Sequence, residues 1–177
     1  MRYLMERQDE LRHLRDGPRK DEKPPMLDYF TARCPGNAES VLKNCKEVLQ
    51  LIFSQDIQDW PSDAVWVSLL PRRFVEACAP EMTEEEVQRY SQWWFSLSWE
   101  EKLRFTRDES NKKWSVGSFV YWFRPEADER QWWWWDAKVE NAHVLHIAVA
   151  IEGLPYASGA LEWLLLASGA TEVEKGN

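Results

Sequence analysis

Four consecutive tryptophans, Trp132 to Trp135, restrict the fold of this chain more than any other feature of its sequence. The surrounding residues favour a strand, in which successive side chains point to opposite faces of the sheet. Trp132 and Trp134 then share one face, and Trp133 and Trp135 share the other. Two indole rings on each face cannot all be left in water. We therefore predict that one pair is core, and that the other either packs under N-terminal helices or is exposed to a partner.

Two more segments have the composition of strands. Residues 114–123, WSVGSFVYWF, are rich in the aromatic and β-branched side chains that favour strands. Residues 143–151, HVLHIAVAI, alternate large apolar side chains with small or polar ones, which predicts a strand buried on both sides. Turns are expected at 123–129 and 140–141. Together with the tryptophan run, these segments predict a three-stranded antiparallel meander.

Helices are predicted before the meander. Asn37 is suited to cap a helix whose apolar residues recur at helical spacing. Two capping boxes follow, Thr83 with Glu86 and Ser98 with Glu101. In such a box a hydroxyl residue and a glutamate three residues later satisfy the first backbone N–H groups of a helix. Two further helices are therefore expected there, packed on each other.

The last helix is predicted between a Ser158 cap and a Gly169 stop, and it is apolar nearly all round, so it has to be buried. Helices first and strands second indicate an α+β fold, with N-terminal helices, an antiparallel meander and a buried C-terminal helix. We divide the chain into a charged N-terminal segment, residues 1–23, predicted as a solvated helix, and a single α+β domain, residues 24–177. Organised structure is expected from about residue 37.

The charge balance excludes some functions. Thirty acidic residues against 22 basic ones give a net charge of -8, which disfavours direct nucleic-acid binding and allows a basic partner. Three cysteines without a C-x-x-C pair indicate reduced thiols in the cytoplasm. No segment has the continuous apolar length of a membrane span, so no membrane association is expected.

Two patterns were weighed as catalytic or metal sites. Asp136 and Lys138 on a strand, after Glu126, resemble the acidic and D/E-x-K arrangement of restriction-type nucleases, which would hydrolyse a phosphodiester with a divalent metal. A cross-strand or surface ion pair is the favoured explanation of these residues. His143 and His146 point to opposite sides of a strand and have no third ligand at suitable spacing. We therefore predict no enzyme, no catalytic residue, no metal and no cofactor.

A partner-binding surface is the remaining candidate. Tryptophan is enriched at binding hot spots, and acidic neighbours suit a basic target. A carbohydrate-binding module that uses exposed tryptophans is an alternative to a protein-binding surface. The candidate partner-binding residues are Trp93, Glu126, Asp128, Glu129, Trp132, Trp133, Trp134, Trp135 and Asp136.

The C-terminal stretch IAVAIEGLPYASGALEWLLLASGA, after the tryptophan-rich strand, resembles a tryptophan-rich α+β family of bacterial immunity proteins. The resemblance covers roughly residues 37 to 170. These proteins accompany polymorphic toxins with a restriction-endonuclease fold, including nuclease effectors of type VI secretion systems. The resemblance implies a cytoplasmic protein without catalytic activity that binds and neutralises one toxin. It leaves open whether the protein is a homodimer, and whether it occludes the toxin's active site or blocks toxin assembly.

Overall fold

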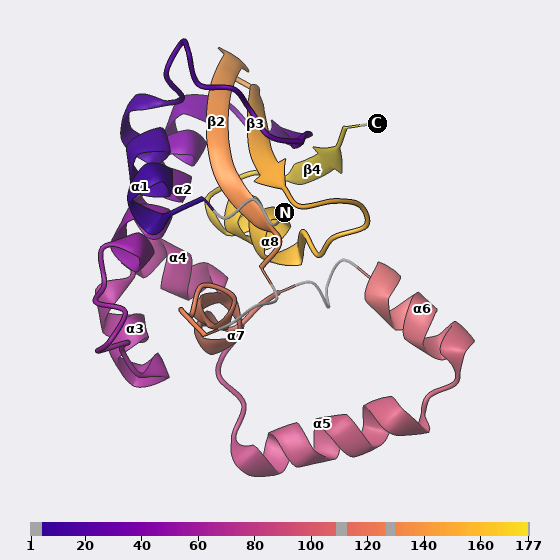
Figure 1. Cartoon of the computed structure of the whole chain (residues 1–177). Helices are drawn as coiled ribbons and strands as arrows, with labels where there is room; N and C mark the ends of the chain where they lie inside the picture. Colours follow the sequence, from indigo (N-terminus) through magenta and orange to yellow (C-terminus); the bar gives the residue numbers. More distant parts are fainter. Residues whose placement is uncertain (1–4, 109–112, 127–129, 177) are drawn as a thin grey trace.

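The computed structural model describes residues 5–108, 113–126 and 130–176, and these form an α+β fold (Figure 1). The helices are α1 (Arg7–Asp16), α2 (Ala38–Phe53), α3 (Asp63–Leu69), α4 (Arg72–Ala77), α5 (Glu84–Ser96), α6 (Trp99–Arg107), α7 (Val116–Tyr121) and α8 (Gly159–Ala167). The strands are β1 (Leu27–Arg33), β2 (Trp132–Asn141), β3 (Val144–Ile151) and β4 (Glu172–Lys175).

The four strands form one antiparallel sheet in the order β2-β3-β1-β4. Only the hairpin of β2 and β3 was predicted. The expected three-stranded meander is wrong, because residues 114–123 contain the helix α7 and not a strand. Ordered structure also begins well before residue 37, since β1 pairs with β3 in the middle of the sheet.

One face of the sheet carries the main core. Helices α2 and α8 pack there, and α8 buries Leu161, Trp163, Leu164 and Leu165, as its apolar sequence predicted. Asn37 caps α2 by accepting a hydrogen bond from the Ser40 N–H, also as predicted.

All four tryptophans of β2 are buried. Trp132 and Trp134 belong to the main core, whereas Trp133 and Trp135 pack with Met5 and Ala150 on the other face. The predicted alternation is therefore confirmed. Of the two alternatives for the second pair, packing under the N-terminal segment is the one found, and exposure to a partner is not.

A β-bulge lies at the last residue of the tryptophan run. The register of β2 against β3 shifts between Trp134 and Asp136, which makes Trp135 an extra residue in the ladder. After the bulge Ala137 packs towards the main core, while Asp136 and Lys138 are exposed. The same strand thus buries large rings on both faces in its first half and presents charged groups in its second.

Helix α1 contacts β2 and α2, and it buries Leu14 in the main core together with two polar side chains, Glu10 and His13. Glu10 is fully buried, and its carboxylate accepts two hydrogen bonds from Arg130, at 2.8 and 2.9 Å, and one from the backbone N–H of Trp134 at 2.8 Å. The Nδ1 of buried His13 lies 2.9 Å from the Trp135 carbonyl oxygen. The N-terminal segment was predicted as a solvated helix, but these two residues satisfy backbone groups of β2 that would otherwise be buried without partners.

Glu22, which lies beyond the end of α1, extends this polar contact by binding two side chains of the helix. Its carboxylate lies 2.8 Å from His13 Nε2 and accepts hydrogen bonds from Arg12 at 2.9 and 3.1 Å. Burial alone would raise the pKa of the Glu22 carboxyl, but hydrogen bonds from Arg12, the Arg19 backbone N–H and His13 outweigh burial and lower the pKa to about 2.

Helices α5 and α6 stand away from the sheet and its covering helices (Figure 1). Both predicted capping boxes are present, with the Thr83 and Ser98 hydroxyls accepting hydrogen bonds from the Glu86 and Glu101 N–H groups. Neither helix, described over its whole length, buries a side chain. We call residues 84–107 the aromatic arm.

No helix in the described part of the chain is long and apolar enough to cross a membrane.

Candidate partner-binding surface

The aromatic arm exposes large apolar side chains. Phe95 is 80% exposed and Trp99 is 73% exposed, and the rings of Tyr90 and Trp93 are each about two-fifths exposed. Isolated exposed apolar residues are ordinary, but several large ones on neighbouring turns mark an interaction site. The arm is therefore the strongest candidate for a binding surface among the described residues.

Ring contacts within the arm hold its two helices together. The Phe105 ring of α6 lies 5.0 Å from the Trp93 ring and 5.9 Å from the Trp94 ring, measured between centroids. Tyr90 contacts Trp93 at 5.4 Å, and the ammonium group of Lys102 lies 5.6 Å from the Trp94 ring centroid. These contacts shape the arm without sealing it from water, so the predicted packing of the two helices is partial.

Acidic residues begin both helices of the arm. Glu84, Glu85 and Glu86 occupy the first turn of α5, and Glu100 and Glu101 the first turn of α6. Hydrogen bonds from the backbone and side chain of Thr83 lower the pKa of Glu86. The Glu86 carboxyl is therefore anionic at neutral pH.

A groove of about 710 Å³ lies between the arm and the body of the protein. Tyr90 and Phe105 line it from the arm, and Trp114 and Ser118 line it from the body. Burial raises the pKa of Cys78, which also lines the groove, to about 11. This thiol is therefore protonated at neutral pH and a poor nucleophile.

The predicted partner-binding residues are not brought together. Trp93 is exposed on the arm, whereas Trp132, Trp133, Trp134 and Trp135 are buried in the body. As buried core residues these four are unavailable to a partner in this conformation. Glu126 and Asp136 are exposed, while Asp128 and Glu129 lie outside the described residues.

Asp136 and Lys138 lie on one exposed side of β2, as strand geometry predicts for residues two apart. The Asp136 carboxylate accepts a hydrogen bond from the Ala137 N–H at 2.8 Å. Within the described ranges, no three His, Cys, Asp or Glu side chains are placed to hold a metal ion.

The two histidines of the H-x-x-H pattern have different partners. His146 lies between Glu140, at 2.6 Å from Nε2, and the Thr31 hydroxyl, at 3.1 Å from Nδ1. His143 accepts a hydrogen bond from the Gly36 N–H through Nδ1 at 3.2 Å. The two imidazoles therefore serve separate contacts that tie β1 and its following turn to β3.

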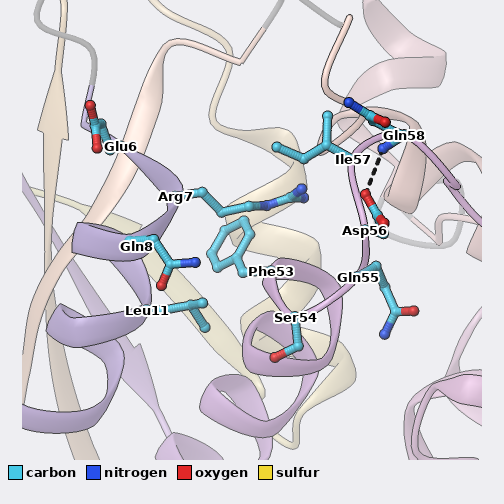
Figure 2. A pocket seen from close by; sticks show the side chains of 10 residues that line it. All are labelled: Glu6, Arg7, Gln8, Leu11, Phe53, Ser54, Gln55, Asp56, Ile57 and Gln58. Carbon is cyan, nitrogen blue, oxygen red and sulfur yellow. Dashed lines mark hydrogen bonds between the residues drawn. The ribbon is translucent and has the colours of Figure 1, made fainter.

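A pocket of about 940 Å³ lies between α1 and the loop after α2 (Figure 2). The Arg7 side chain reaches across it, over the ring of Phe53 at 5.6 Å from the centroid and near that of Trp60 at 5.2 Å. Burial and the nearby Arg130 lower the pKa of Arg7. The lining mixes this cation with Glu6 and Asp56, so the pocket favours no particular charge of ligand.

Sequence reasoning missed Phe95 and Trp99, the two most exposed aromatic rings of the arm. Phe95 lies off the apolar stripe of α5, and Trp99 is the first residue after the Ser98 cap. A large ring away from the stripe of an amphipathic helix is the signal that would have found Phe95. Of the tryptophans on these two helices only Trp93 was predicted to bind a partner, because the exposure of Trp99 depends on tertiary contacts.

Comparison with known proteins gives no match, either to a protein-family model, to a curated protein or to a solved structure.

Proposed function

We propose that this chain is a protein-binding protein, and more specifically an immunity protein that binds and neutralises a secreted nuclease toxin in the cytoplasm of the producing cell. The proposal takes its functional class from the resemblance of residues 37 to 170 to immunity proteins. Its structural support is the aromatic arm, which exposes Phe95 and Trp99 and buries none of its side chains. The role assigned is binding, so no residue is given a catalytic part.

Burial of the arm by a partner would stabilise the complex. Aromatic side chains bury large areas with few rotatable bonds, and interface alanine scans find tryptophan among the residues whose loss weakens binding most. Phe95, Trp99 and Trp93 are already held on short helices with capped N-termini. Little conformational entropy is then lost on binding, which favours affinity.

The charge of the chain supports a basic partner. Its net charge is -8, and acidic residues occupy the first turns of both arm helices. A toxin that cleaves nucleic acid has to attract a phosphate backbone and therefore presents basic surface. Opposite charges accelerate the encounter and select against wrong partners, while the aromatic rings supply most of the affinity.

Co-expression with the toxin encoded by the neighbouring gene tests the proposal. We expect rescue of growth, and a complex in a pull-down whose affinity falls about tenfold or more for Phe95→Ala and for Trp99→Ala. Tyr29→Ala is the matched control, because Tyr29 is also an exposed aromatic residue but lies on the sheet. Its affinity should stay within about threefold of the wild type.

The possible outcomes distinguish failure of the immunity function from failure of the aromatic arm as the binding surface. Absence of both rescue and a complex with the wild-type protein would rule out the immunity function. A complex that tolerates Phe95→Ala and Trp99→Ala together would retain the function but show that the arm is not the binding surface. Saturable quenching of tryptophan fluorescence by oligosaccharides, lost in Trp99→Ala, would instead support a carbohydrate-binding module.

A further inference from the structure

We propose that a second pocket, formed by Trp114, α8 and β4, receives a lysine or arginine side chain of the protein partner. This inference rests on the proposed function, since it takes the partner to be a protein with a basic surface. It adds a specific contact, away from the exposed rings of the arm, that would select for a basic residue.

The pocket combines aromatic walls with carboxylates. Its volume is about 760 Å³, and Trp114, Trp163, Leu166 and Val173 line it together with Glu162 and Glu172. None of the described residues that line it is basic. An organic cation gains from an aromatic face and from a carboxylate at once, so this lining suits a guanidinium or ammonium group.

The chain uses the same chemistry to hold its own cations. Arg130 pairs with Glu10 and lies 5.2–5.9 Å from the centroids of four aromatic rings. The ammonium group of Lys175 lies 3.9 Å from the Tyr156 ring centroid and 3.1 Å from an Asp28 carboxylate oxygen. The Trp114 pocket has the same two components, and the lining supplies no cation of its own.

The two carboxylates of the pocket differ in the partners that they already have within the chain. Glu162 accepts a hydrogen bond from the Ser158 hydroxyl at 2.6 Å and pairs with no cation among the described residues. Glu172 lies 3.6 Å from Arg33, but both side chains are more than half exposed, and such pairs are weak. Glu162 is therefore the main anchor, and Glu172 can turn to a cation supplied by a partner.

The position of the pocket suits a partner that also contacts the arm. Trp114 lines both this pocket and the groove beside the arm, in which Tyr90 and Phe105 form the opposite wall. A protein seated against the arm can therefore extend a basic side chain past Trp114 into the pocket.

A small probe tests the chemistry of the pocket. Nα-acetyl-arginine amide is titrated into ¹⁵N-labelled protein, and the indole N–H signal of Trp114, assigned with Trp114→Phe, is followed. Nα-acetyl-citrulline amide is the control, because it keeps the shape of the side chain without its charge. We expect saturable shifts with the arginine probe alone, and at least about threefold weaker binding for Glu162→Gln. Equal shifts with both probes, or none with arginine, would overturn the inference.

Binding of the toxin tests whether the basic side chain in the pocket comes from the protein partner. The double variant Glu162→Gln with Glu172→Gln should bind the toxin about tenfold more weakly. Glu174→Gln, which removes one negative charge from the same strand as Glu172 but outside the pocket lining, should not change the affinity. If arm variants weaken the complex and the double variant does not, the pocket inference fails and the immunity function stands. If wild-type protein binds no toxin, the proposed function fails first.

Discussion

Replacing Glu10 with alanine tests whether a buried ion pair holds α1 against the sheet. The fully buried carboxylate accepts hydrogen bonds from Arg130 and from the Trp134 N–H. The change leaves the Arg130 side chain, which is only 14% exposed, without its counter-ion. Breaking a buried pair from one side costs about 3–5 kcal/mol, so we expect the free energy of unfolding to fall by that amount.

Urea denaturation followed by tryptophan fluorescence measures this loss. With a denaturant slope of about 2 kcal/mol per molar urea, the midpoint should fall by about 1.5–2.5 M. Alanine keeps the helix propensity of the position high. Glu6→Ala is the control, because Glu6 is exposed and makes no side-chain cap of α1, and its free energy of unfolding should change by less than about 0.5 kcal/mol.

A double variant decides whether the loss comes from an unpaired charge. Glu10→Leu with Arg130→Met leaves neither charge buried, and methionine can still contact the surrounding rings. It should be more stable than Glu10→Ala, because replacing a whole buried pair with apolar residues is often close to neutral. The ion-pair account is refuted if the double variant loses as much free energy of unfolding as Glu10→Leu and Arg130→Met lose separately when their two losses are added.

Three further predictions follow from the same geometry. The folded-state pKa of Glu22 is about 2 against an ordinary 4.5, so the stability that this carboxylate gives the fold is present above pH 4.5 and is lost as the pH falls towards 2. In a series of urea midpoints measured against pH, Glu22→Gln should therefore flatten the fall between these two values. Trp135→Ala should lower the free energy of unfolding by about 3–5 kcal/mol, whereas Trp99→Ala should change it by less than about 0.5 kcal/mol, measured by urea denaturation. Tyr156→Phe removes the hydrogen bond that the Tyr156 hydroxyl donates to Asp28 at 2.6 Å, and calorimetry should show a loss of about 1–2 kcal/mol.

Helix α7 shows how a local preference for strand was overridden. Its segment is rich in aromatic and β-branched residues, and this composition led to the strand prediction. The buried residues Val116, Phe119, Val120 and Phe123 nevertheless recur at helical spacing. The hydroxyl of Ser115 caps the helix by accepting a hydrogen bond from the Ser118 N–H at 3.1 Å. Spacing and cap were both readable in the sequence, and they outweigh composition.

Strands β1 and β4 were harder to predict because their stability comes from pairing. β1 follows a proline-containing segment, and only Phe30 and Ala32 of its side chains are buried. β4 has four residues, of which Val173 alone packs towards the core. Neither pattern is long enough to stand out, and both strands form because β1 completes the ladder of β3 and then offers its own edge to β4. Such non-local pairing is not encoded in any single segment.

Tryptophan is a core residue in β2 and an exposed residue in the aromatic arm, and hydrophobicity alone does not distinguish these two roles. The N-terminal segment covers Trp133 and Trp135, and α1 docks through the buried polar side chains of Glu10 and His13 as well as through buried Leu14. A pattern of apolar residues does not reveal the polar part of this contact, so the sequence left the second tryptophan pair open to a partner. Trp99 follows a cap that predicts a packed helix, yet no described element covers it. With the run of four used in the core, we propose the aromatic arm as the binding surface, and variants of Phe95 and Trp99 decide whether that assignment is right.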